Sequence, residues 1–149
     1  MKPEYMELAL KEAMKAYKED EVPVGAVLVC DDKVIAKAHN KKEKKKNPLC
    51  HAEIETIKKG IKRLDSKYLD NCDLYVTLEP CAMCAGAIIQ ARIRNVYYGA
   101  YDPKSGSVES VIRIFDEKKF NHHPLYKGGI MKDECAKILQ DYFSNKRQK

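Results

Sequence analysis

The sequence predicts a single α/β domain in which helices cover both faces of a partly parallel sheet. Its 149 residues have the length of one ordinary domain and can bury a sizeable core without help from disulfides. Predicted strands alternate with predicted helices, as they do where helical crossovers join parallel strands. Hydrophobic residues make up 44% and charged residues 34%, with only 7 Gly and 6 Pro, which excludes disordered and collagen-like classes. The chain contains no internal repeat and no interdomain linker, so we expect one domain over residues 1–149.

The first predicted elements are a helix and a β-hairpin. Apolar residues recur at helical spacing over residues 3–18. A valine-rich run over residues 22–30 and a second extended run over residues 34–38 flank two aspartates, whose turn chemistry predicts the hairpin. Gly25 in the first strand indicates close approach of another group to the backbone.

A lysine-rich loop separates the hairpin from a second predicted helix. That helix covers residues 51–59, and Gly60 is placed to end it. The later predicted elements are a strand at residues 74–78, a helix at 82–91, a strand at 95–99, a polar loop at 101–107 and a final helix at 132–143. Residues 108–129 are irregular and carry no predicted element.

The charge of the chain is basic and unevenly distributed. A formal net charge of +6 and a pI of about 8.9 favour polyanionic partners only mildly. The excess is concentrated in five lysines within residues 41–46 and in Lys146, Arg147 and Lys149 at the C-terminus. These clusters fit contact with nucleic acid, and the alternative is a solvated surface that keeps the protein soluble.

Neither a membrane span nor an export signal is predicted. The longest uncharged run has 12 residues, over residues 80–91, whereas a span needs roughly 20 apolar residues. The first residues mix acidic and basic side chains and lack a continuous apolar core, so a cytoplasmic location is expected. Disulfides rarely persist in that compartment, so the six cysteines predict metal ligation or burial, and Cys30 and Cys135 are expected to be small core residues.

Two short segments carry the predicted chemistry. Each begins a predicted helix: His51 and Glu53 lie in the first, and Cys81 and Cys84 lie in the second. Two cysteines three positions apart project onto one helix face and suit two corners of a tetrahedral zinc site, and His51 supplies a third corner. Three protein ligands leave a fourth position for a water that the metal acidifies. Glu53 then lies close enough to act as a proton shuttle without binding the metal.

The alternative is a closed, structural zinc site with four protein ligands. Cys50 is the obvious candidate for the fourth ligand, but neighbouring residues at a helix start point in divergent directions. The remaining histidines, at positions 39, 122 and 123, lie in segments without ligand-like spacing.

The sequence around these residues resembles that of the bacterial tRNA adenosine deaminase family, within the cytidine deaminase superfamily. His-x-Glu followed 30 positions later by Pro-Cys-x-x-Cys is typical of zinc-dependent nucleobase deaminases. The segments that carry the resemblance are Glu21–Val27, Ala38–Asn40, His51–Ile54, Leu74–Cys81, Met83–Ala87 and Asp133–Ala136. The resemblance covers nearly the whole chain, and the string from Val76 to Cys81 is more specific than the metal ligands alone.

The resemblance implies a three-layer α/β/α fold with a five-stranded mixed sheet, and a homodimer. It also implies one zinc ion per chain and conversion of adenosine to inosine at the wobble position of a tRNA anticodon stem-loop, with Glu53 as base and acid in turn. By the same resemblance, the residues expected near the RNA are Asn40, Ala52, Asp102, Lys104, Asn121, His122 and Phe143, with Lys146 and Arg147 in the helix that closes over it.

Some positions depart from the family pattern, and two other functions stay open. Cys50 occupies a place where a small residue is usual, the loop over residues 41–46 is unusually basic, and Val108 and Glu109 replace small residues. One alternative is a free nucleobase or nucleoside deaminase acting on guanine or cytosine, which needs the same zinc ligands but no phosphate contacts. The other is a zinc-stabilised RNA-binding module without catalysis.

Overall fold

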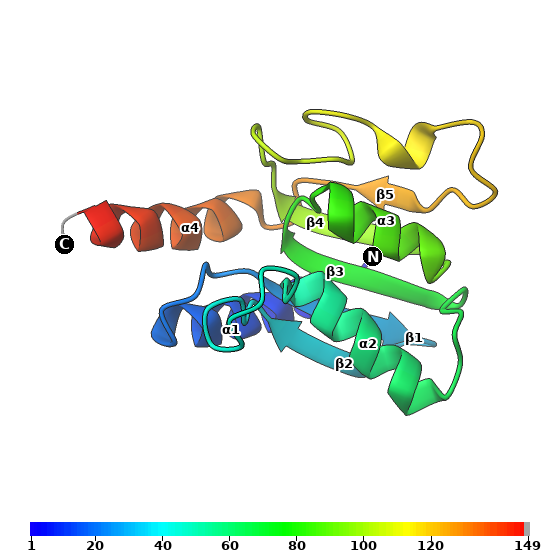
Figure 1. The fold of residues 1–149 in the computed structure, drawn as a ribbon, viewed down its shortest axis with the longest axis horizontal. Helices are drawn as coiled ribbons and strands as arrows, with labels where there is room; N and C mark the ends of the chain where they lie inside the picture. Colours follow the sequence, from blue (N-terminus) through cyan, green and yellow to red (C-terminus); the bar gives the residue numbers. More distant parts are fainter. Residues whose placement is uncertain (148–149) are drawn as a thin grey trace.

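The computed structural model describes residues 1–147 and the side chains of residues 1–146 (Figure 1). The strands are β1 (Gly25–Cys30), β2 (Lys33–His39), β3 (Cys72–Leu78), β4 (Asn95–Ala100) and β5 (Leu125–Lys127). The helices are α1 (Pro3–Lys18), α2 (Ala52–Leu64), α3 (Ala82–Gln90) and α4 (Lys132–Arg147), with a short 3-10 helix η1 (Ile114–Asp116). Of the basic tail, Lys149 lies outside the described residues and the Arg147 side chain lies outside the described side chains.

The five strands form one mixed sheet in the order β2-β1-β3-β4-β5. β1 is antiparallel to β2 and β3, whereas β3, β4 and β5 run parallel to one another. Helices α2 and α3 cover one face, and α1 and α4 pack together on the other (Figure 1). The predicted three-layer α/β/α fold is therefore confirmed, and the carboxyl ends of β3 and β4 meet where Leu78 pairs with Ala100.

The first helix and the hairpin agree with the sequence prediction. α1 has the predicted bounds, and its buried residues Met6, Ala9 and Ala13 face the sheet. Gly25 lets α1 approach closely, since a Cβ at that position would lie 2.1 Å from the carbonyl oxygen of Ala9. Close packing of α1 on β1 therefore requires a residue without a side chain at this position.

Helix α2 is longer than predicted, because Gly60 does not end it. The helix continues to Leu64, and Asp65 terminates it in the left-handed conformation with φ 50°. Gly60 is buried against the hairpin, and a Cβ there would lie 2.4 Å from Cδ2 of Leu28. Gly60 thus permits close packing of α2 on the sheet, and this packing stabilises the helix beyond a residue that would otherwise favour its end.

The region without a predicted element contains η1 and β5. β5 has only three residues, and its pairing with β4 places Leu125 opposite Asn95 at the edge of the sheet. So short a strand carries no alternation that a sequence pattern could reveal. Helix α4 also extends further than predicted, to Arg147.

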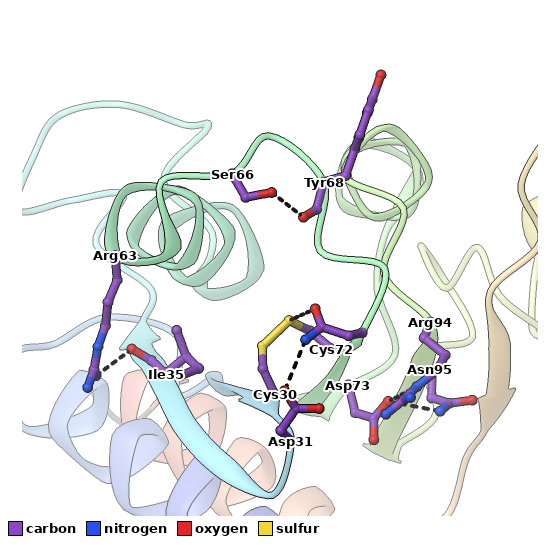
Figure 2. The surroundings of a disulfide bond; sticks show 11 residues. Cys30, Asp31, Ile35, Arg63, Ser66, Tyr68, Cys72, Asp73, Arg94 and Asn95 are labelled. Atoms are coloured by element: carbon purple, nitrogen blue, oxygen red, sulfur yellow. Dashed lines mark hydrogen bonds and ion pairs between the residues drawn. A yellow bond between two sulfur atoms is a disulfide. The ribbon is translucent and has the colours of Figure 1, made fainter.

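A disulfide joins Cys30 at the end of β1 to Cys72 at the start of β3 (Figure 2). The prediction that Cys30 is a core residue is confirmed, but the expectation that the cysteines form no disulfide is wrong. Antiparallel pairing places these two residues directly opposite each other with a Cα–Cα distance of 4.3 Å, and both are buried. The register, which the sequence separation of 42 does not reveal, creates the pair. Cys135 is buried and unpaired, as predicted.

Helix α3 is the most apolar helix, but it has only nine residues. None of the helices within residues 1–147 combines the length and the apolar character that crossing a membrane requires.

Removing the disulfide should destabilise the protein without changing its fold. Replacing Cys30 and Cys72 by alanine releases a constraint on the unfolded chain, so the free energy of unfolding should fall by about 2 to 4 kcal/mol. Urea unfolding followed by circular dichroism measures the change. A phosphine reductant should destabilise the natural protein by a similar amount and leave the double variant unaffected; equal stability of all four samples would contradict the structural role of the bond.

Candidate active site

The predicted metal ligands converge at the carboxyl end of β3. His51 immediately precedes α2 and Cys81 immediately precedes α3, while Cys84 lies in the first turn of α3. Their ligand atoms all lie within 4.8 Å of one another. Nδ1 of His51 lies 3.7 Å from Sγ of Cys81 and 3.6 Å from Sγ of Cys84.

These separations fit a single tetrahedral zinc ion. With Zn–S bonds near 2.3 Å and a Zn–N bond near 2.05 Å, tetrahedral angles place a nitrogen and a sulfur ligand about 3.6 Å apart. The observed 3.7 and 3.6 Å agree with that value, so Nδ1 is the imidazole atom suited to bind the metal. Two thiolates and one imidazole are also ligands that zinc prefers.

The electrostatic environment favours ionisation of one thiol. A hydrogen bond from Cys84, followed by one from His51, lowers the pKa of Cys81 to about 4, and burial opposes this shift. The same thiol–thiolate contact, together with burial, raises the pKa of Cys84. A negative charge is therefore already stabilised where a cation would bind.

Residues that could have closed the site lie elsewhere. Cys50 is buried beside Glu55 and Lys45, and burial raises the pKa of its thiol. His39 lies between the carboxylates of Glu12 in α1 and of Glu19 directly after it, with Nδ1 3.1 Å from Glu12 and Nε2 3.0 Å from Glu19. Within residues 1–147, the metal-ligand group consists of His51, Cys81 and Cys84, which supports an open rather than a closed site.

Glu53 lies in the first turn of α2 and is 4% exposed. Burial is the main cause that raises the pKa of its carboxyl to about 7. The neighbouring Cys81 thiolate adds to this shift, whereas His51 opposes it. A buried carboxyl group with a pKa close to neutral is suited to accept and return a proton.

A hydrogen bond joins the side chain of Asn40 to the backbone of Ala52. The backbone N–H of Ala52 donates to Oδ1 of Asn40 at 2.8 Å, and Nδ2 of Asn40 donates to the carbonyl oxygen of Val22 at 3.1 Å. This links the end of β2 to the start of α2 beside His51. The expected contacts of Asn40 and Ala52 with a base stay predictions, since both groups are occupied by these bonds here.

A small pocket opens from the ligand group into a larger groove. The pocket has a volume of about 160 Å³ and is lined by Asn40, His51, Glu53, Cys81 and Asp102, among others. The groove, of about 840 Å³, is lined by Tyr101, Asp102, Lys104, Phe143 and Lys146, among others. Asp102 therefore lies beside the ligand group, whereas Lys104 and Phe143 line the groove further out, and the expected contacts of all three with RNA stay predictions.

The loop that carries Asp102 and Lys104 is organised by a buried carboxylate, Glu79. It accepts backbone N–H groups from Asp102 at 3.1 Å, Glu109 at 2.8 Å and Ser110 at 2.9 Å. Burial alone would raise the pKa of Glu79, but the hydrogen bonds from Ser110, Glu109 and Asp102 outweigh it and lower the pKa. The sequence prediction missed this role, although an acidic residue directly before Pro80 at the end of a buried strand was a usable signal.

Asn121 and His122 lie away from the ligand group. They line a separate cavity of about 270 Å³ with Tyr68, Gln90 and Arg92, at the far end of α3. Nε2 of His122 lies 2.7 Å from the carbonyl oxygen of Ile93, just before β4 begins. A nine-residue helix is roughly 14 Å long, so these residues do not reach the pocket of their own chain.

Comparison with known proteins places the chain in a family. A family model described as MafB19-like deaminase matches residues 2–147. A protein named tRNA-specific adenosine deaminase from Agrobacterium fabrum is 49% identical over 143 residues, covering 96% of this chain and 94% of its own. The protein of the same name from Bacillus subtilis is 42% identical over 145 residues, covering 97% and 90%.

Solved structures agree with this assignment. One, from work on A-to-I editing by tRNA deaminases at the wobble position, superposes with a TM-score of 0.90 at 48% identity, over 93% of this chain and 100% of that one. A guanine deaminase from Nitrosomonas europaea shares the fold, with a TM-score of 0.81. It is 21% identical, over 97% of this chain and 85% of that one. The chain therefore belongs to the MafB19-like deaminase family, and bacterial proteins named tRNA-specific adenosine deaminase are similar to it along nearly their whole length.

Proposed function

We propose that this chain is a zinc-dependent deaminase that converts adenosine to inosine at the wobble position of a tRNA anticodon. The observation that carries the proposal is that two members of the three-ligand group, His51 and Cys81, line a small pocket together with Glu53, and that this pocket continues into a groove lined by Lys104 and Phe143. A flipped base fits the pocket, and the groove leaves room for its RNA neighbours. The relatives named tRNA-specific adenosine deaminase support this substrate.

The chemistry assigns one role to the metal and several to Glu53. His51, Cys81 and Cys84 would hold a zinc ion, which would supply Lewis-acid chemistry and acidify a water at the open position. The Glu53 carboxylate takes a proton from the water that attacks C6 of adenine and passes it to N1. Once the C–O bond has formed, Glu53 takes the remaining proton of the new hydroxyl group at C6 and delivers it to the amino group. The C–N bond then breaks, a C=O bond forms at C6 and ammonia leaves, while N1 keeps the first proton.

The alternative, a free nucleobase or nucleoside deaminase, uses only the small pocket. The groove beyond it is open to solvent and lined by Lys104 and Lys146, which a substrate without phosphates does not need. A tRNA substrate also supports a cytoplasmic location, where the Cys30–Cys72 disulfide would be an exception to the rule that such bonds rarely persist. The family match over residues 2–147 supports one catalytic domain. The disulfide lies at the opposite end of β3, so this chemistry does not depend on it.

A homodimer is part of the proposal, with α3 at its centre. The outward residues Met83, Gly86 and Ala87 recur at helical spacing and are only partly buried, and a methyl group added at Gly86 would meet nothing within 4 Å. An uncharged, partly exposed helix face of this kind suits a second copy of the chain. A twofold axis across α3 runs the two helices antiparallel, so Asn121 and His122 of one protomer would approach the pocket of its partner.

Replacing Glu53 by glutamine should separate chemistry from binding. Because the amide cannot accept the proton, kcat should fall by about 10²- to 10⁴-fold, while zinc content stays near one ion per chain and stem-loop affinity is unchanged. Inosine formation, metal analysis and a stem-loop binding titration measure the three properties. Cys84→Ala is the contrasting variant and should lose the zinc; unchanged turnover in Glu53→Gln would overturn the mechanism.

The choice of substrate is tested with matched RNA and small molecules. An anticodon stem-loop with a wobble adenosine should yield inosine, whereas free adenosine, guanine and cytidine should not react at comparable rates. Product analysis by mass spectrometry measures this. Rapid turnover of guanine or cytidine, with none of the stem-loop, would favour the free-base alternative.

The proposed dimer predicts complementation between two defective variants. Glu53→Gln lacks the proton shuttle, and Asn121→Ala lacks the residue offered to the partner, so each should be weak alone. After subunit exchange at equal concentrations, half of the dimers are mixed and one of the two sites in each is intact, which should give about a quarter of natural activity. If Asn121 acted within its own chain, or not at all on the substrate, mixing would add nothing beyond the sum of the two variants.

A further inference from the structure

Lys42 lies where the pocket opens into the groove. It lines the pocket that contains His51 and Glu53, and it also lines the groove that contains Lys104 and Phe143. Of the described residues that line both, Lys42 is the one cation; the others are Val22, Leu78, Asp102 and Ser105. We infer that Lys42 binds the phosphate next to the target nucleotide and thereby positions that nucleotide in the pocket, an inference that rests on the proposed function.

The other lysines of this loop do not share its position. Nζ of Lys45 lies 2.6 Å from Oε1 of Glu55, a buried carboxylate of α2. Nζ of Lys44 lies 3.9 Å from Oε1 of Glu19 at the end of α1. Within the described part of the chain, no carboxylate lies within ion-pairing distance of Nζ of Lys42. Its charge is therefore available for an external anion.

The backbone around Lys42 is held in place before any ligand binds. The carboxylate of Glu21, which is 2% exposed, accepts the backbone N–H of Glu43 at 3.0 Å and of Lys44 at 2.8 Å. The carbonyl oxygen of Lys42 itself accepts the N–H of Asn47 at 2.9 Å. A phosphate contact from this position orders only the lysine side chain, which lowers the entropic cost of binding.

The location fixes which part of the RNA Lys42 can meet. A base in the pocket beside Glu53 has its ribose at the pocket mouth, and the two phosphates attached to that ribose emerge there. Lys104 and Lys146 line the groove but not the pocket, so they suit phosphates further along the strand. An ammonium group on a flexible stem neutralises a phosphate as a point charge and needs no fixed hydrogen-bond geometry.

The first test compares two single-charge variants of the same loop. Lys42→Gln and Lys44→Gln each remove one positive charge, but only Lys42 faces the pocket mouth. Binding of the anticodon stem-loop is measured in the Glu53→Gln background, so that the RNA is not consumed. Loss of one phosphate contact should reduce the salt slope of log affinity by about 0.7, which corresponds to about eightfold weaker binding at 50 mM salt and about threefold at 200 mM.

Lys44→Gln should bind like its parent, and Lys42→Arg should retain most of the affinity. With Glu53 present, Lys42→Gln should raise KM and leave kcat unchanged, because the contact exists equally in the bound substrate and the transition state. Zinc content and thermal midpoint confirm that each variant is folded.

The second test locates the phosphate. Stem-loops carrying an uncharged methylphosphonate at one or the other linkage of the wobble adenosine are bound to both proteins. At one of the two linkages, the methylphosphonate should weaken binding to the parent protein by the same factor as the Lys42→Gln substitution does. The same methylphosphonate should not weaken binding to the Lys42→Gln protein any further. The inference would be overturned if, at both linkages, the effect of the methylphosphonate multiplied that of Lys42→Gln. It would also be overturned if the Lys42→Gln protein bound the stem-loop no more weakly than the Lys44→Gln protein. If the natural protein neither binds nor deaminates the stem-loop, that result contradicts the proposed function and, with it, the role of Lys42.

Discussion

The buried carboxylate of Glu79 is the interaction on which the arrangement of the active site depends. β3 ends at Leu78, and each of the next three residues has a different role. The Glu79 side chain binds the loop over residues 101–110, Pro80 breaks the strand, and Cys81 immediately precedes α3. Without the carboxylate, the backbone N–H groups of Asp102, Glu109 and Ser110 would lose this hydrogen-bond partner, and the N–H of Val108, a buried residue, would be left unpaired. A Cβ at Gly106 would lie 2.4 Å from Cδ of Glu79, so the loop wraps the carboxylate closely.

The same device recurs on the other side of the pocket. Glu21 binds the backbone of the lysine-rich loop, and Asn40 joins the end of β2 to the start of α2. In both loops a buried polar side chain replaces the strand or helix partners that irregular backbone lacks. The pocket is therefore bounded by loops whose positions are set by Glu21, Asn40 and Glu79, rather than by the sheet alone, and this holds charged side chains such as Lys42 and Lys104 at defined places.

What the sequence could predict was governed by how local the signal was. The bounds of α1 follow from its apolar spacing, and the metal ligands follow from the spacing of His51, Cys81 and Cys84, because helix geometry fixes where such side chains point. Gly60 and the Cys30–Cys72 pair were misread because each depends on packing or register between distant segments. The cavity around Asn121 and His122 depends likewise on how residues 117–124 fold back towards α3, which no local pattern specifies.

The location of the chemistry also explains why the fold alone does not select a substrate. His51, Glu53 and Cys81 lie at helix starts that any chain with this architecture can provide, and the guanine deaminase that shares the fold superposes with a TM-score of 0.81 at only 21% identity. Substrate choice must then reside in what surrounds the pocket mouth. Here that surrounding consists of two loops anchored by Glu21 and Glu79 and of α4, whose Tyr142 hydroxyl donates to the carbonyl oxygen of Asp20 at 3.1 Å. Because these anchors lie outside the metal-ligand group, the loops can differ in charge and reach while His51, Glu53 and Cys81 keep their places at the helix starts.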